Sequence, residues 1–121
     1  RFASELYQFI FFGVWDVQKP HHCSPFEVVV AVEVIEHVAD PRVAIANMRA
    51  VCTETMWIST PNGNNAKRPP DNPHHVCEYT TREMMEMLPV TVPVPKILAW
   101  DDFRELDLDT DVTPLVYRVD L

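Results

Sequence analysis

An uninterrupted apolar run, FEVVVAV at residues 26–32, places the strongest constraint on how this chain of 121 residues can fold. A strand with one solvent-exposed face would alternate apolar and polar residues, and here only Glu27 is polar. Such a run is typical of a parallel strand that is covered on both faces. We therefore expect residues 26–32 to form a buried strand of an α/β sheet.

The residues that follow predict a helix and a second strand. Asp40 suits a helix N-cap and Pro41 suits the first helical position. Apolar residues then recur with helical spacing, which predicts a helix over 41–52. Residues 55–60, TMWIST, have the composition of a strand. The stretch 26–60 thus predicts a right-handed βαβ unit with parallel strands.

The rest of the chain predicts further elements of a single α/β domain over residues 1–121. Thr80 and Glu83 form a capping box that would begin a helix. The other expected elements are the end of a helix at 2–8, a buried strand at 9–15, a long loop at 61–79, a helix at 81–88, and strands near 91–98 and 114–119.

Charge and cysteine content limit the partners and the compartment. The net charge is -8, with 18 acidic and 10 basic residues, which argues against a broad nucleic-acid-binding face. Three widely spaced cysteines predict free thiols in a reducing compartment. Without a signal peptide or a run of 18 apolar residues, we expect a cytoplasmic protein that has no membrane span.

Acidic and imidazole side chains gather where the predicted strands end. Glu33, Glu36 and His37 follow the strand at 26–32, and His75 lies with Glu78 on the long loop that leaves the next strand. Because ligands of open parallel sheets bind beyond the carboxyl ends of the strands, we expect these groups to meet at one edge. Two carboxylates with one or two imidazoles suit Mg²⁺, Mn²⁺ or Zn²⁺.

A second interpretation of these residues needs no metal. Glu36 and His37 precede a predicted helix N-terminus, where acidic groups interact favourably with the helix dipole. His74 and His75 would then be a solvated pair in a loop. Spacing alone leaves both interpretations open.

Three blocks of the sequence resemble the C-terminal half of class I S-adenosylmethionine-dependent methyltransferases, in the type 11 group that includes the ubiquinone-pathway O-methyltransferases. The blocks are FEVVVAVEVIEHVADP (26–41), WISTPN (57–62) and NPHHVCEYTTREM (72–84). The resemblance implies a Rossmann-like, mostly parallel sheet and S-adenosylmethionine as the cofactor. The family's Gly-rich turn, D-x-G-x-G-x-G, has no counterpart here, since the chain has only Gly13 and Gly63. We therefore expect a sheet truncated at its N-terminal strands.

The resemblance also implies a metal site. In ubiquinone-pathway relatives and in small-RNA 2′-O-methyltransferases, an E-x-x-E-H block binds a divalent metal, and Glu33, Glu36 and His37 match that block. His75, before VCEYT, matches a further histidine ligand of the RNA enzymes. The same resemblance makes Glu36 and His37 the catalytic candidates, with His37 as an alternative general base.

For the cofactor, the resemblance implies three neighbours. The end of the strand at 26–32, with Val32 and Glu33, would line the methionine side of S-adenosylmethionine. Asp16, in GVWD, matches the position of an acidic residue near the adenine amino group. The long loop, with Asn62 and the Lys67–Arg68 pair, would be a lid over the substrate.

Several functions follow from these features. The leading hypothesis is methyl transfer to an oxygen or nitrogen of a small molecule, sugar or lipid precursor. The alternatives are a non-catalytic methyltransferase-like remnant that serves as an interaction module, a metal-dependent RNA 2′-O-methyltransferase-like enzyme, and a metal-dependent hydrolase. Strands without their neighbours would leave open sheet edges, which predicts a homo-oligomer or a partner chain that covers them.

Overall fold

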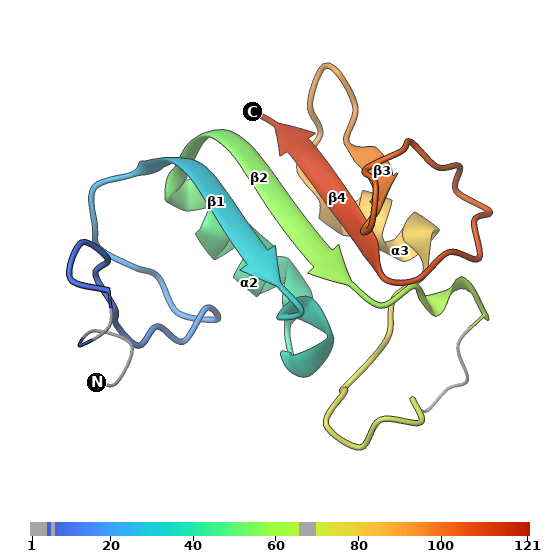
Figure 1. Ribbon diagram of the computed structural model, residues 1–121, viewed down its shortest axis with the longest axis horizontal. Coiled ribbons are helices and arrows are strands. Elements are labelled where there is room, and N and C mark those ends of the chain that lie inside the picture. The colour runs from blue at the N-terminus through green and yellow to red at the C-terminus, as the bar shows by residue number, and fades with distance from the viewer. Residues whose placement is uncertain (1–4, 6, 66–69) are drawn as a thin grey trace.

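Four strands form a single sheet in the computed structural model, which describes residue 5 and residues 7–65 and 70–121. The strands are β1 (Phe26–Val32), β2 (Cys52–Thr60), β3 (Lys96–Ala99) and β4 (Leu115–Asp120), in the spatial order β1-β2-β4-β3. Figure 1 shows β1 at one edge of the sheet and β3 at the other. Helices α2 (Pro41–Ala50) and α3 (Thr81–Met87) and the short 3-10 helices η1 (Ile35–His37) and η2 (Gly63–Asn65) complete the described elements.

The sheet is mixed, so the predicted mostly parallel, Rossmann-like sheet is wrong. Only β1 and β2 run parallel, with Val30 opposite Trp57. β4 is antiparallel to both of its neighbours, β2 and β3. A loop without a crossover helix joins β3 to β4, and such a connection favours an antiparallel pair. What the sequence did predict is the βαβ unit β1-α2-β2.

One face of β1 is open, which corrects the expectation of a strand covered on both faces. Both helices lie on the same side of the sheet, behind the strands in Figure 1. On that side Ala31 is buried. On the other side Val28, Val30 and Val32 keep 50%, 61% and 51% of their surface exposed. β1 therefore has the composition of a covered strand but the position of an edge strand.

Local sequence signals account for where the two helices start. The Asp40 carboxylate accepts a hydrogen bond from Val43 N–H at 3.2 Å and Pro41 is the first helical residue, as predicted. Thr80 and Glu83 make the predicted capping box, which is confirmed. Within the described ranges, no helix combines the length and the apolar character that a membrane crossing requires.

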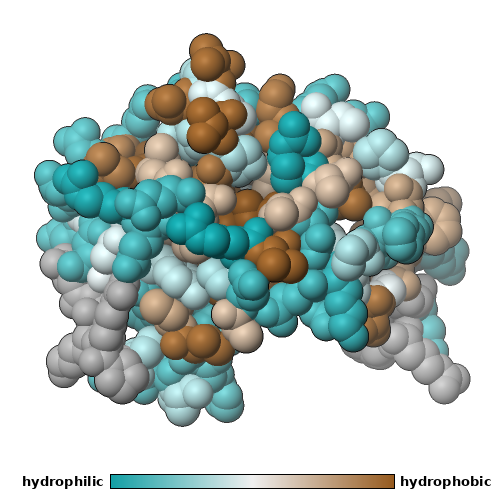
Figure 2. Space-filling model, turned by 180° about the vertical axis from the view of Figure 1, so that it is seen from behind, coloured by the Kyte–Doolittle hydropathy of each residue, from teal (hydrophilic) through white to brown (hydrophobic). Residues whose placement is uncertain are grey.

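The core lies between the helices and the covered face of the sheet. Ile45 and Met48 of α2 are buried there against strand residues such as Met56, Ile58 and Tyr117. From the helix side the surface is largely hydrophilic, with apolar groups near the top of the molecule (Figure 2), where the loop between α3 and β3 lies. Burial of these apolar side chains stabilises the packing of α2 on the sheet.

The N-terminal segment is not the strand predicted for residues 9–15. Phe9, Phe11 and Val14 are fully exposed, and within the described residues the segment belongs to no ladder. Its later residues are tied to the start and middle of α2: Asp40 N–H donates to the Gln18 side chain, and the Asn47 amide donates to Val17 O. Of the helix end predicted at 2–8, residues 2–4 and 6 lie outside the described residues.

Candidate functional site

A sharp turn at Glu33 places the candidate site beyond the end of β1. Glu33 has a φ of 52°, in the left-handed region that non-glycine residues rarely adopt. Its N–H donates to Ser59 O of β2 at 3.1 Å, which holds the turn. The chain then enters η1, which carries Glu36 and His37. This short helix lies next to the end of β2, where Thr60 Oγ donates a hydrogen bond to the Glu36 carboxylate. Such strained positions cluster at functional sites.

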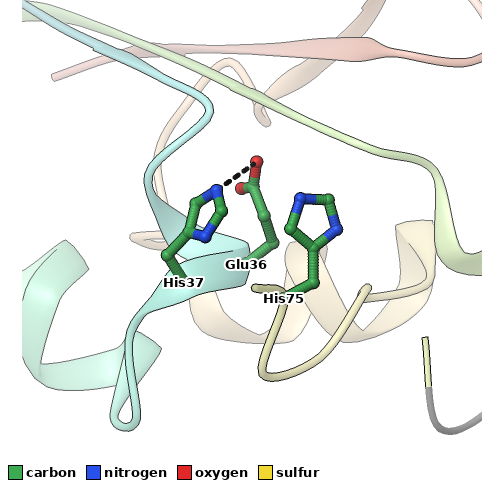
Figure 3. A group of neighbouring side chains, drawn as sticks. All are labelled: Glu36, His37 and His75. Carbon is green, nitrogen blue, oxygen red and sulfur yellow. Dashed lines mark ion pairs between the residues drawn. The ribbon is translucent and has the colours of Figure 1, made fainter. Parts of the chain in front are cut away.

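Three of the predicted metal ligands come together in space. Glu36 and His37 of η1 and His75 of the loop after β2 each offer a ligand atom, and these atoms lie within 4.8 Å of one another. Figure 3 shows the Glu36 carboxylate between the two imidazole rings. Glu36 is fully buried, whereas His37 is exposed and His75 partly buried. Glu33 stands next to this group without belonging to it.

Backbone hydrogen bonds hold the loop that carries His75. Val76 N–H donates to Glu36 O at 2.7 Å, so the loop is bonded directly to η1. On its other side, Gly63 N–H donates to Tyr79 O at 2.9 Å. A Cβ on Gly63 would overlap the backbone of Glu78 and Tyr79. Gly63 is thus required for close approach of the loop, a role that the sequence did not reveal because it depends on a distant segment.

The buried carboxylate of Glu36 has one ion-pair partner among the described residues, His37, which is a counter-charge only when its ring is protonated. Its Oε2 accepts a hydrogen bond from Thr60 Oγ at 3.0 Å. Its Oε1 has no hydrogen-bond partner among the described residues, and His37 Nε2 lies 3.8 Å away. A buried carboxylate oxygen without a donor is costly. This arrangement is suited to a cation.

The Glu33 carboxyl lies beside the Glu36 carboxyl and is repelled by its negative charge. Burial raises the pKa of its carboxyl, and the neighbouring Glu36 carboxyl raises it further. Ser59 Oγ donates to Glu33 Oε1 at 3.0 Å, which acts in the opposite direction but does not prevail. A proton on Glu33, or a cation beside the two carboxyls, would relieve this repulsion.

Both imidazoles present the same nitrogen to the carboxylate. His37 Nδ1 lies 2.8 Å from the carbonyl oxygen of His74, which can only accept, so Nδ1–H is the donor. His75 Nδ1 lies 2.8 Å from the Glu78 carboxylate, which leads to the same assignment. In the neutral form of each ring, Nε2 then keeps its lone pair. Two imidazole nitrogens and a carboxylate oxygen form a ligand set for a borderline divalent metal.

Other predicted site residues lie elsewhere. The contacts of Asp16 are with its chain neighbours Gln18 and Lys19. Val32 is on the open face of β1. Asn62 is buried, and its amide donates to Thr110 O and Val112 O, so it anchors the start of the long loop. Lys67 and Arg68 lie outside the described residues.

An apolar groove runs along the open face of β1, on the side of the sheet away from the helices. It has a volume of about 300 Å³. Val28, Val30 and Val32 line it on one side, and Trp57, Trp100 and Phe103 on the other. The rings of Trp57 and Phe103 meet edge to face at 5.9 Å, and the Arg118 guanidinium stacks over Trp57. We call this feature the β1 groove.

Comparison of the chain with family models, with curated proteins and with solved structures finds no match.

Proposed function

We propose that the chain binds a divalent metal through Glu36, His37 and His75, beside Glu33, and uses it in methyl transfer from S-adenosylmethionine. The acceptor would be an oxygen or nitrogen of a small molecule, sugar or lipid precursor. One observation carries the metal centre: the buried Glu36 Oε1, which has no hydrogen-bond partner among the described residues, lies beside two imidazoles whose Nδ1 atoms are already engaged.

The ligand set favours a particular class of ion. Two imidazole nitrogens and one or two carboxylate oxygens suit Mn²⁺ or Zn²⁺ better than Mg²⁺, which takes mostly oxygen ligands. A metal bound there would act as a Lewis acid, lowering the pKa of a substrate hydroxyl. The chain's own contribution is to hold these side chains and orient the acceptor, since methyl transfer depends mainly on alignment.

Support for methyl transfer comes from the sequence blocks around these residues. The E-x-x-E-H block and the histidine before VCEYT are the positions to which the family resemblance assigns metal ligands, and three of these four side chains are neighbours. Asp16, Val32 and Glu33 remain predicted cofactor contacts. An RNA acceptor is less favoured, because the net charge of -8 opposes phosphate binding.

Metal titration tests the proposal directly. Mn²⁺ and Zn²⁺ binding would be followed by calorimetry for the wild type, for Glu36→Gln and for Glu27→Gln, a matched control at an exposed glutamate of β1. We expect one site in the wild type and in the control, and none in Glu36→Gln. Equal uptake by all three chains would exclude the metal centre. A parallel titration with S-adenosylmethionine tests the cofactor: a single-site isotherm supports methyl transfer, and the absence of binding at millimolar cofactor favours a non-catalytic role.

A second candidate function, an interaction module, is favoured by the open edge of β1. Backbone groups alternate between the two edges of a strand, and Glu33 N–H points to β2. The N–H and C=O groups of Val28, Val30 and Val32 therefore point away from β2, where no strand of the described chain pairs with them. The strand carries no proline and no lysine, the usual protections of an edge.

The negative charges of Glu27 and Glu33, at the two ends of β1, limit which strand could pair with its open edge. An antiparallel second copy centred on Val30 would set Glu27 opposite Glu33 of that copy, and like charges across a pair are destabilising. We therefore propose that the edge accepts an extended segment of another protein, with apolar residues facing the β1 groove and Lys or Arg at its ends. Strand addition of this kind is a common mode of peptide recognition.

A labelled peptide tests this second function. The probe is a seven-residue strand with valines at alternate positions and a lysine at each end, followed by fluorescence anisotropy. Val30→Lys should abolish binding, because it places a charge on the edge strand. Val90→Lys, at a fully exposed valine of the loop before β3, is the matched control and should bind normally. Sedimentation of the chain as a dimer that Val30→Lys dissociates would instead identify a second copy as the occupant.

A further inference from the structure

His75 is held from both sides by side chains that agree on its tautomer. The Glu78 carboxylate, 2.8 Å from Nδ1, accepts only, so Nδ1 carries the proton. On the other side, Asn72 Nδ2 lies 3.2 Å from Nε2. The Asn72 amide is oriented by its own oxygen, which accepts from His74 N–H at 2.9 Å, and its NH₂ group therefore faces the ring as a donor. The lone pair of His75 is thus on Nε2.

Burial makes the bond between His75 and Glu78 effective. The two side chains keep only 11% and 18% of their surface exposed, so water screens their interaction weakly. In His37, by contrast, a backbone carbonyl fixes the tautomer, and no substitution of a side chain removes it. The two imidazoles meet edge to face, with ring centroids 4.7 Å apart, so the orientation of one ring limits the other.

We propose that Glu78 is a positioning residue of the metal centre: it holds His75 with Nδ1 protonated and directs the Nε2 lone pair toward the Glu36 carboxylate. This inference rests on the proposed metal-binding function. A carboxylate that accepts the second N–H of a histidine ligand fixes the ring and makes its other nitrogen a better donor. Figure 3 shows the His75 ring directed at Glu36, as this role requires.

Two substitutions separate the parts of this role. Glu78→Gln keeps an oxygen that can accept from Nδ1–H but removes the charge, so the tautomer should persist and metal affinity should fall several-fold. Glu78→Ala removes the acceptor, so the tautomer should become mixed and metal affinity should fall roughly 10–100-fold. Glu86→Ala, at an exposed glutamate of α3, makes the same change of charge as Glu78→Ala away from the site and serves as the control.

Two measurements on each variant test the role. The first is the pair of imidazole ¹⁵N chemical shifts of His75 in the metal-free protein, which report the tautomer without any metal. The second is the Zn²⁺ dissociation constant from competition with a chromophoric chelator. Far-ultraviolet circular dichroism identifies any variant that fails to fold, and in that case Glu78→Gln carries the test through its predicted several-fold loss of affinity.

The outcomes distinguish this inference from the metal centre itself. A wild type that binds Zn²⁺, together with a folded Glu78→Ala variant of unchanged ¹⁵N shifts and affinity, would overturn the role of Glu78 alone. A wild type that takes up no metal would overturn both. A mixed tautomer with weakened Zn²⁺ binding in Glu78→Ala, and normal behaviour of Glu86→Ala, is the result that we expect.

Discussion

The His37 and His75 rings stand edge to face, 4.7 Å between centroids, although one belongs to η1 and the other to the loop after β2. Their proximity depends on the hydrogen bond from Val76 N–H to Glu36 O, which joins these two segments of backbone. Main-chain hydrogen bonds therefore assemble the site, while the buried Glu36 carboxylate keeps one oxygen without a hydrogen-bond donor among the described residues.

Removing the charge of Glu36 should stabilise the metal-free protein while destroying the metal site. Glu36→Gln keeps an acceptor for Thr60 and eliminates a buried carboxylate whose Oε1 has no donor among the described residues. We expect a gain of about 1–2 kcal/mol in the free energy of unfolding in chelator. Urea denaturation with and without Zn²⁺ measures it. Zn²⁺ should stabilise the wild type and leave the variant unchanged.

A methyl group at Gly63 should displace the loop that carries His75. In Gly63→Ala the new Cβ would overlap the backbone of Glu78 and Tyr79, which cannot move without breaking the Gly63 N–H bond to Tyr79 O. We expect a loss of about 2 kcal/mol in stability and weaker metal binding. Gly13→Ala is the control, since its Cβ would have no heavy atom within 4 Å. Equal behaviour of the two variants would contradict the role given to Gly63.

What the sequence could predict was mainly local. The starts of α2 and α3 follow from Asp40 and from the Thr80–Glu83 pair, whose capping interactions span three residues. The convergence of η1 with the loop after β2 was also predictable, because the ends of adjacent parallel strands share one edge of a sheet.

Features that depend on distant segments were not predictable in this way. The exposure of β1 follows from its edge position and from the packing of both helices on one side of the sheet, and an apolar run reveals neither. The strand predicted at 91–98 begins only at Lys96, because Pro93 and Pro95 cannot donate to a ladder. The contact of Gly63 with Tyr79 and the amide of Asn72 against His75 depend on loop packing, for which the sequence has no periodic signal.

The free energy of unfolding of the metal-free protein should fall as the pH rises above the ordinary pKa of a glutamate side chain. The pKa of Glu33 is raised above 4.5 in the folded state, so between the unfolded and folded values the native protein holds a proton that the unfolded chain has released. This contribution to stability is present below the unfolded pKa and is lost as the pH passes the folded pKa. Urea denaturation across this range, in chelator, measures the slope.

Glu33→Gln gives the control for this pH effect. Its amide imitates the protonated carboxyl, since it can donate toward Glu36 and accept from Ser59. The part of the slope due to Glu33 should therefore disappear, while Glu27→Gln, at an exposed position of β1, should leave it intact. A slope that is identical in the wild type and in Glu33→Gln would show that this carboxyl does not titrate abnormally.

Tyr117 offers a test of the core that is independent of the metal site. Its side chain is fully buried, its hydroxyl has no hydrogen-bond partner among the described residues, and burial raises its pKa far above the usual value. Tyr117→Phe should therefore raise the free energy of unfolding by about 1 kcal/mol, because no buried hydroxyl remains unsatisfied. A loss of stability in urea denaturation would mean that the hydroxyl has a partner, such as an ordered water.

Asn72 should compete with the metal for His75. Its Nδ2 lies 3.2 Å from His75 Nε2 and donates to the lone pair that a metal would need. Since one lone pair serves one partner, metal binding must break this hydrogen bond, and Asn72→Ala should bind Zn²⁺ about fivefold more tightly, the equivalent of one hydrogen bond of about 1 kcal/mol. Competition titration measures the affinity, and Asn47→Ala, on α2 away from the site, is the matched control. Weaker binding by Asn72→Ala would reverse the interpretation, because the amide would then be needed to orient the ring through the His74 N–H contact.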